Sequence, residues 1–207
     1  MKKRRISLVL ATRNPGKTRE FLRLFEELAP EVRWNLRRAD EVGLHDVQET
    51  GATFAENARQ KAREAATQSG LVCLGEDSGI EVDCLGGAPG VRSHRFSSTG
   101  EDDDNNALLL QMMKDVPPNH RTARYRSAVA VYGPNGMIVE AEGSVEGIIL
   151  GERRGTNGFG YDPLFFSTEV GKTLGEASAA EKDAVSHRRR ALEKALPSIL
   201  VGVLADS

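Results

Sequence analysis

Two adjacent carboxylates, Glu76 and Asp77, stand inside the apolar stretch of residues 73–84, immediately before a Ser-Gly step. If this stretch is a strand, alternation sends the two side chains to opposite faces, unless residues 78–79 bend the chain. The two acids are therefore predicted to have different roles. A carboxylate within reach of a metal-bound water can accept its proton. Taken alone, the pair is more typical of a solvated acidic turn than of a catalytic site.

A third carboxylate, Glu49, lies just before a Thr-Gly turn. Mg²⁺ binds oxygen ligands and takes one or two protein carboxylates when it also bridges substrate phosphates. Glu49 and Asp77 could supply that pair, although a glutamate at such a position is more commonly an exposed residue with no functional role. Cys73 and Cys84 lack a C-x-x-C partner and the four histidines are scattered, so neither a zinc site nor a disulfide framework is predicted. Any metal is expected to be held by oxygen.

The segment TRNPGKT, residues 12–18, is a polar turn between an apolar run and a helical pattern. Backbone N–H groups and the helix dipole at such a position favour an anion, and Lys17 adds a positive charge for a phosphate. A P-loop ends in the same GKT, but it would require glycine at position 11, where the chain has Ala11. This segment alone leaves a phosphate site and an ordinary helix start both open.

Two later segments carry groups that suit a nucleobase. In GTNGFGYD, Phe159 lies between glycines, where a base could stack on it, and Asp162 offers a hydrogen-bond acceptor. A glycine-rich turn anchored by its aromatic residues is the alternative. In EKDAVSHRRRAL, the donors of Lys182, His187 and Arg188 would favour a carbonyl on the base and disfavour an amino group. A basic solvated face competes with this interpretation.

The elements that must position these groups follow from periodicity and capping. Residues 5–11 read as a buried strand, and the apolar residues that follow recur at helical spacing. Residues 53–69 are predicted to form an alanine-rich helix, capped by Thr53 and Glu56 and ended by Gly70. We expect a further strand at 71–74, a helix from 101, a long hairpin around GPNG, and a C-terminal helix from Ser178 to near Pro197. On a continuous helix, His187 would point away from the apolar stripe; whether the helix restarts at Ser186 is open.

The length, composition and net charge of the chain limit the possible functions of the protein. The chain has 207 residues with 39% hydrophobic content, enough to bury a core, and we expect a single domain over residues 1–207. Its formal net charge of −2, with basic residues spread along the chain, predicts no nucleic-acid partner. The first apolar stretch is too short for a signal sequence or a membrane span, so we expect no membrane association and a cytoplasmic location.

Five segments, in chain order, closely resemble the motifs of the inosine triphosphate pyrophosphatase family: TRNPGK, ETGATFAENA, EDSGIEVDCLGGAPGVRS, GFGYDPLFF and EKDAVSHR. Each is weak by itself, but five in register are highly specific. The resemblance implies an elongated α/β fold of two lobes around a long central mixed β-sheet, with the nucleotide in the cleft between them. It also implies a homodimeric, Mg²⁺-dependent house-cleaning hydrolase that cleaves ITP, dITP and XTP to the monophosphate and pyrophosphate.

The resemblance also implies roles for individual residues. Asp77 is similar to the general base, Glu49 and Asp77 to the metal carboxylates, and Ser78 to a substrate contact. The triphosphate would be bound by the loop of Thr12, Arg13, Asn14, Pro15, Gly16 and Lys17. The base would be bound by the stacking aromatic Phe159 with its neighbours Gly160, Tyr161 and Asp162, and by Lys182, His187 and Arg188.

The sequence departs from the family pattern at four positions. Glu76 stands where bacterial members usually have Asp, which leaves its share in metal binding open, and the other three departures are His94, Ser98 and Arg189. None touches Asp77. A non-catalytic nucleotide-sensing module that uses the same loops is the alternative from a different class, and a P-loop phosphotransferase is a second enzyme alternative.

Overall fold

The computed structural model describes residues 3–45 and 47–205. The chain divides into two compact units, which are described separately below. The first consists of Met1–Asp77, Ser127–Gly143 and Arg188–Ser207, and the second of Ser78–Arg126 and Ser144–His187. Among the described residues, no helix combines the length and the apolar character that a membrane-spanning segment needs.

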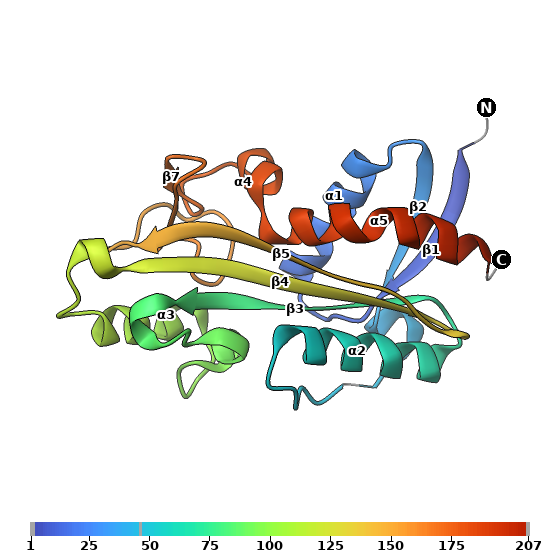
Figure 1. Cartoon of the computed structure of the whole chain (residues 1–207), viewed down its shortest axis with the longest axis horizontal. Helices are drawn as coiled ribbons and strands as arrows, with labels where there is room; N and C mark the ends of the chain where they lie inside the picture. The colour runs from blue at the N-terminus through green and yellow to red at the C-terminus, as the bar shows by residue number, and fades with distance from the viewer. Residues whose placement is uncertain (1–2, 46, 206–207) are drawn as a thin grey trace. The chain divides into compact units, whose positions relative to one another are not determined.

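Seven strands form one mixed sheet in the order β2-β1-β3-β4-β5-β6-β7 (Figure 1). The strand β1 is parallel to both β2 and β3, whereas β6 is antiparallel to β5 and to β7. The predicted mixed α/β class is therefore confirmed. The strands are β1 (Arg4–Leu10), β2 (Val32–Arg38), β3 (Cys73–Val82), β4 (Thr122–Gly133), β5 (Gly136–Ile149), β6 (Phe165–Ser167) and β7 (Lys172–Thr173).

The helices begin and end largely where capping residues predict. Thr53 accepts a hydrogen bond from the Glu56 amide at the start of α2, and Gly70 ends that helix with φ of 67°. Ser178 and Glu181 form the predicted capping box, which opens the short helix α4. The helices are α1 (Pro15–Leu28), α2 (Phe54–Ser69), α3 (Asp102–Met112), α4 (Ala179–Val185) and α5 (His187–Ala205).

In the first unit, helices cover both faces of the sheet (Figure 1). Side chains of α1 and α5, such as Phe21, Phe25 and Leu192, pack on β1 in one core, and α2 packs on the opposite face. Alanines let α2 approach very closely: a Cβ added at Gly75 of β3 would lie 2.2 Å from the Ala58 carbonyl oxygen. This close packing brings the polar side chains of α2 next to β3.

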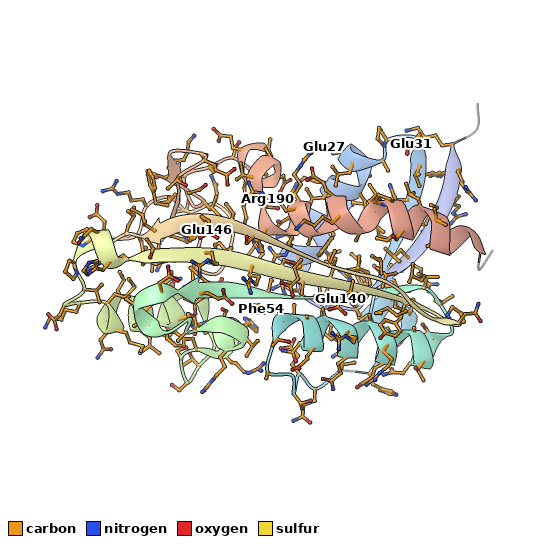
Figure 2. The ribbon with its side chains drawn as sticks, viewed as in Figure 1. Glu27, Glu31, Phe54, Glu140, Glu146 and Arg190 are labelled. Atoms are coloured by element: carbon orange, nitrogen blue, oxygen red, sulfur yellow. The ribbon has the colours of Figure 1, made fainter. Side chains whose placement is uncertain are left out.

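A surface ion pair also connects α2 to the sheet. Arg59 Nε donates to Glu140 Oε2 on β5 at 2.9 Å, and Figure 2 labels Glu140 on that strand. Because both side chains are partly exposed and solvent screens their charges, the pair contributes little stability. The helix is therefore held on the sheet mainly by its buried alanines.

The second unit has its own core, which supports the glycine-rich loop of residues 155–162. Leu109 and Met113 of α3 pack with side chains of β3, β4 and β5, and Tyr161 and Leu164 join the same cluster. The rings of Tyr125 and Phe165 lie 4.8 Å apart between centroids. The loop is thus anchored to the core through Tyr161. This agrees with the alternative interpretation of the segment, a glycine-rich turn anchored by its aromatic residues.

The structure corrects several expectations. The C-terminal helix does not end near Pro197, since α5 contains this proline and continues to Ala205. Ser186 is extended, with ψ of 147°, so a new helix begins at His187. Residues 78–79 continue β3 instead of bending it, and Gly79 has a different use: a Cβ there would lie 2.2 Å from Ser93 Oγ. The strand β2 was not predicted.

Candidate functional site

The adjacent acids Glu76 and Asp77 contact different elements within the first unit. Because β3 runs straight through both residues, their side chains project to opposite faces of the sheet. Asp77 contacts α2, and Glu76 contacts α1 and α5. The expected separation of the two acids is confirmed, and each acid must be considered with its own neighbours.

Asp77 is at the centre of a buried polar cluster. Asn57 Nδ2 donates to Asp77 Oδ2 at 2.9 Å, and Lys61 Nζ lies 3.4 Å from Asp77 Oδ1. The same ammonium donates to Glu49 Oε1 at 2.8 Å. The i, i+4 spacing of Asn57 and Lys61 places both on the face of α2 that packs against β3. Four residues from the 49–51 turn, α2 and β3 thus converge.

Burial sets the protonation behaviour of this cluster. Asp77 is 5% exposed, and burial raises its pKa above the ordinary value although the ammonium groups of Lys61 and Lys17 oppose the shift. For Lys61, burial favours the neutral form, but the carboxylates of Asp77 and Glu49 outweigh it and raise the pKa. A buried carboxylate of raised pKa next to a fixed cation is typical of functional sites, and its increased proton affinity suits a proton acceptor.

The two predicted metal carboxylates, Glu49 and Asp77, fit a magnesium ion that takes few protein ligands. Both bind the same ammonium of Lys61, so their oxygens already face a common positive charge. In the described part of the chain, no group of three or more His, Cys, Asp or Glu side chains could hold a metal. This donor set suits Mg²⁺, which binds one or two carboxylates together with water and substrate phosphates.

Glu76 holds two cations in place. Its side chain is ion-paired with Lys17 Nζ at 2.8 Å and with Arg188 Nε at 3.0 Å, and it accepts a hydrogen bond from Ser127 Oγ. Arg188 in turn pairs with Glu20 at 3.1 Å. Burial opposes the charge of Glu76, but Lys17 and Arg188 outweigh it and hold its pKa well below the ordinary range. Glu76 therefore positions Lys17 and Arg188.

The N-terminal loop of the first unit is a capped helix start. Asn14 is the N-cap of α1, and its side-chain oxygen accepts from the amides of Gly16 and Lys17 at 2.8 and 3.1 Å. These two amides already donate to Asn14 and are not free to bind an anion. The turn alone had suggested that such amides could bind one. The Asn14 amide itself donates to Thr12 Oγ1, and Pro15 is the first helical residue. Arg13 donates to the Leu44 carbonyl.

In the second unit, three of the predicted base-binding residues, Phe159, Asp162 and Lys182, form one connected group. Lys182 Nζ lies 4.5 Å from the centre of the Phe159 ring and makes a short hydrogen bond to Asp162. The same Asp162 carboxylate accepts from the Phe159 amide at 2.9 Å. Asp162 is 1% exposed, so its acceptors are engaged by the loop and by Lys182. Its predicted contact with a base remains a prediction.

Helix α3 binds the backbone amide and the backbone carbonyl of Gly160, the residue that follows Phe159. Asp102 Oδ2 accepts from the Gly160 amide at 2.7 Å, and Asn106 Nδ2 donates to the Gly160 carbonyl at 2.9 Å. Tyr161 is buried, and its hydroxyl donates to the Ser93 carbonyl at 2.8 Å. Burial raises the pKa of Tyr161. These bonds order the loop on both sides of Phe159.

His187 differs from its prediction. It is 2% exposed and stacks on Tyr125, with ring centroids 4.9 Å apart and planes 10° from parallel. The expectation that it lies away from the core is wrong, because the helix restarts at this residue and changes the direction of its side chain. Ser78 lies on β3 directly after Asp77 and is partly buried.

Comparisons with known proteins identify the family of this chain. The family model of the Ham1 family matches residues 8–198. The chain belongs to the Ham1 family. A dITP/XTP pyrophosphatase of Desulforamulus reducens is 47% identical over 192 residues, which is 92% of this chain and 94% of the relative. A dITP/XTP pyrophosphatase of Thermus thermophilus is 45% identical over 193 residues, 93% of this chain and 91% of the relative.

Solved structures of Ham1 proteins have the same fold. A HAM1 protein from Coxiella burnetii is 35% identical, covers 98% of this chain and 100% of its own, and superposes with a TM-score of 0.81. A dITP/XTP pyrophosphatase from Mycobacterium abscessus is 42% identical, covers 93% of this chain and 100% of its own, and has a TM-score of 0.74. The family resemblance carried by the five sequence motifs is confirmed.

Sequence reasoning underrated three residues of this Ham1 protein. In the sequence, the i, i+4 spacing of Asn57 and Lys61 is equally typical of a solvated helix stripe, and only the packing of α2 on β3 identifies them as partners of Asp77. Asp102, for its part, is what a helix N-terminus favours, so its sequence position needs no other explanation. No local signal links it to Gly160, which is 58 residues away.

Proposed function

We propose that this protein is a nucleoside triphosphate pyrophosphatase that hydrolyses ITP, dITP and XTP to the monophosphate and pyrophosphate, and so removes them from the nucleotide pool. The observation that carries the proposal is the buried Asp77, which has a raised pKa and is fixed between Asn57 and Lys61. The two relatives described above, which are named dITP/XTP pyrophosphatases, align over 92% and 93% of this chain. The match to the Ham1 family spans residues 8–198, a range that includes Asp77.

Asp77 acts as the general base. Asn57 binds one of its oxygens, so the carboxylate is oriented, and the other oxygen faces Lys61 and Glu49. A water held next to Asp77 loses its proton to the carboxylate as it attacks the phosphorus of the α-phosphate. Burial supports this role because it raises the proton affinity of Asp77.

Cationic side chains stabilise the negative charge of the triphosphate. Lys17, held by Glu76, and Lys61, held by Asp77 and Glu49, provide two fixed ammonium groups in the first unit. Such preorganised charges act on the charge that develops during phosphoryl transfer. Glu49 and Asp77 would hold Mg²⁺. When bound, this ion would neutralise phosphate charge and polarise the scissile phosphoryl group.

Base selection rests on a donor in the second unit, Lys182. Phe159, with Lys182 fixed against its ring, offers a stacking surface for a purine. An ammonium group donates hydrogen bonds and accepts none, so it favours a 6-oxo purine over the 6-amino group of ATP. We further propose that the protein is a homodimer; size-exclusion chromatography with light scattering tests this.

The function is tested by incubating the protein with Mg²⁺ and ITP, XTP, dITP, ATP or GTP and resolving the products by ion-exchange chromatography. We expect IMP and pyrophosphate from ITP, and slow turnover of the standard nucleotides. Release of IDP and inorganic phosphate would refute the proposal. ATP turnover as fast as ITP turnover would favour a phosphotransferase instead.

A nucleotide sensor would bind the same ligands without turnover, and Asp77→Asn separates the two functions. The variant keeps the size of the side chain but cannot accept a proton, so we expect turnover to fall by at least about 10²-fold. ITP binding, measured by calorimetry, should persist. Asp115→Asn, at an exposed position, is the control and should behave as wild type. If wild type binds ITP with Mg²⁺ and never turns over, the sensor alternative holds.

A further inference from the structure

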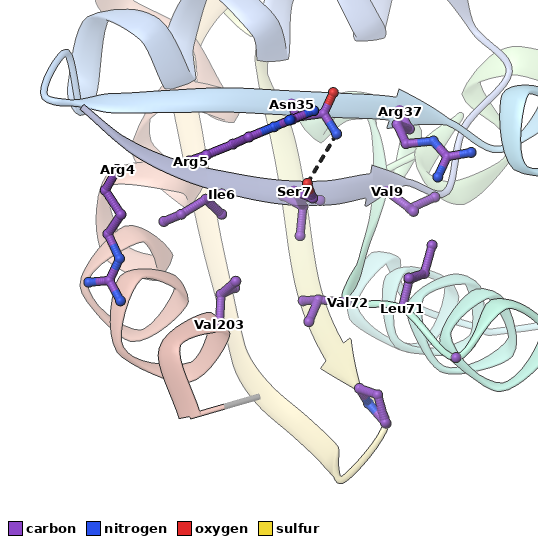
Figure 3. Close-up of a pocket in the computed structure, with 13 residues that line it drawn as sticks. Arg4, Arg5, Ile6, Ser7, Val9, Asn35, Arg37, Leu71, Val72 and Val203 are labelled. Atoms are coloured by element: carbon purple, nitrogen blue, oxygen red, sulfur yellow. Dashed lines mark hydrogen bonds between the residues drawn. The ribbon is translucent and has the colours of Figure 1, made fainter. Parts of the chain in front are cut away.

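A cavity of about 450 Å³ lies in the first unit beside the N-terminal half of β1 (Figure 3). None of its lining residues belongs to the site proposed above. Leu71, Val72 and Val203 form part of its apolar surface, and Ser7 and Asn35 are polar lining residues. Its volume is within the range of small-molecule binding sites.

Among the described residues, the charged side chains that line this cavity are all arginines. Arg4, Arg5 and Arg37 contribute to it, and the lining includes no Asp or Glu from the described part of the chain. Within the described ranges, none of the three is ion-paired with a carboxylate; Arg37 donates only to the Glu41 carbonyl, at 3.4 Å. The neighbouring Arg38, by contrast, is paired with Asp40 at 2.8 Å. The cavity therefore has positive charge that these side chains leave uncompensated.

The register of β1 and β2 concentrates this charge further. Arg5 lies directly opposite Arg33, and Val9 lies opposite Arg37. Between them, Asn35 Nδ2 donates to Ser7 Oγ at 3.0 Å, as the dashed line in Figure 3 shows. Like charges directly opposite one another on a sheet are destabilising. Departures from local rules of this kind are expected at functional sites. A bound anion would compensate the two positive charges here.

The backbone of β1 adds donors at the same place. The Val9 amide donates to the Val72 carbonyl, and the Ala11 amide to the Leu74 carbonyl, so odd-numbered residues direct their amides to the β3 side. The register of β1 with β3 includes only Val9 and Leu10. Because strand residues alternate, the amides of Arg5 and Ser7 point to this open edge, next to the cavity.

We propose that this cavity is a second anion site, which binds a phosphate-bearing small molecule. Arg5 and Arg37 are separated by four strand residues, about 13 Å at ~3.3 Å per residue, which two flexible guanidinium groups can bridge to one ligand. Guanidinium groups bind phosphate oxygens in pairs, and the open-edge amides add neutral donors. Leu71, Val72 and Val203 provide an apolar surface for the remainder of a nucleotide-sized ligand.

Nuclear magnetic resonance on the full chain tests this site without turnover. Inorganic pyrophosphate, inorganic phosphate and IMP are titrated separately, in EDTA, into ¹⁵N-labelled protein. We expect the amide signals of Arg5, Ser7 and Arg37 to shift in a transition separate from any shift of the Thr12–Lys17 loop. A stronger response to IMP than to pyrophosphate identifies a nucleotide site, and the reverse identifies an inorganic polyphosphate site.

A double variant, Arg5→Gln with Arg37→Gln, should weaken the Arg5 and Ser7 transition at least ~10-fold and leave ITP turnover unchanged. Arg63→Gln, which makes the same Arg-to-Gln change at one exposed position on α2, is the control and should leave the transition intact. The proposal is overturned if shifts are confined to the Thr12–Lys17 loop, or if the double variant retains them. It is also overturned if only a polyglutamate peptide or an RNA oligonucleotide moves these signals.

The result is independent of the proposed function. Loss of the second transition in the double variant supports the site even if ITP is never hydrolysed. Conversely, normal ITP hydrolysis with no response at Arg5 and Ser7 refutes only the second site.

Discussion

Asn106 on α3 donates its side-chain amide to the Gly160 carbonyl at 2.9 Å, and thereby holds the residue next to Phe159. One turn earlier on the same helix, Asp102 accepts from the Gly160 amide at 2.7 Å. Both polar groups of Gly160 are therefore bound by one helix. Because Asp162 also fixes the Phe159 amide, the proposed stacking ring is preorganised before a base arrives.

Asp102→Ala should raise the KM for ITP about tenfold and change kcat less. The substitution removes the hydrogen bond to the Gly160 amide, so Phe159 must be ordered during binding, while Asp77 and Lys61 are untouched. Steady-state kinetics with ITP measures both constants. Asp103→Ala is the matched control, because Asp103 is an exposed acid in the same first turn. A kcat loss as large as the KM change would contradict a positioning role.

Lys61→Met should reduce kcat about 10²- to 10³-fold, the usual cost of removing one preorganised electrostatic group. The ammonium lies between Asp77 and Glu49, and methionine keeps a similar length without the charge. Single-turnover measurements at saturating ITP report the chemical step. Lys114→Met, at an exposed position on the other unit, should retain wild-type turnover. Near-normal turnover in Lys61→Met would mean that this cation only stabilises the fold.

Gly75→Ala should destabilise the protein by about 1–3 kcal/mol, as overpacking does in a filled core. The added Cβ would lie 2.2 Å from the Ala58 carbonyl oxygen and 2.6 Å from the Ala62 amide nitrogen, so α2 must move away from β3. Asn57 and Lys61 would move with the helix, and turnover should fall as well. Urea denaturation gives the free energy of unfolding.

Gly151→Ala is the corresponding control, since the nearest atom to its added Cβ is an Arg121 side-chain nitrogen at 3.4 Å. If both alanine variants unfold at the same urea concentration as wild type, the interface between α2 and β3 can accommodate one additional methyl group. That result would contradict the packing described for this helix.

Glu181→Gln should change how stability depends on pH. The hydrogen bond from Lys172, together with the Ser178 amide, lowers the pKa of Glu181 to about 2. A depressed carboxyl pKa stabilises the fold above the unfolded value, ordinarily 4.5, and this contribution is lost as the pH falls toward 2. The gap in melting temperature between wild type and Glu181→Gln should be largest at pH 6 to 7 and should narrow between pH 5 and 3.

Because Glu181 is exposed, added salt should reduce the same gap. Glutamine can still accept from the Ser178 amide, so the cap itself is retained. A gap that is constant across this pH range would show that the charge of Glu181 does not contribute to stability.

Much of the local structure could be predicted from the sequence. The apolar run at 5–11 became β1, the alanine-rich segment became α2 with Gly70 at its end, and the strands around GPNG became β4 and β5. These features depend on periodicity and on caps, which act between residues a few positions apart. Whether the helix restarts at Ser186 stayed open in the sequence, because the segments on both sides of Ser186 are compatible with one continuous helix; the structure decides it, since Ser186 is extended.

By itself, the sequence determined which chemical groups are present, the family to which the chain belongs, and that strand alternation separates Glu76 from Asp77. Only the tertiary structure decided the partners of these groups. Arg188 is 112 residues from Glu76, and the cluster around Asp77 depends on how closely α2 packs on β3. Likewise, the position of Arg5 directly opposite Arg33 depends on the register of β1 with β2. Register and helix packing minimise the free energy of the whole core, so no local stretch of sequence specifies them.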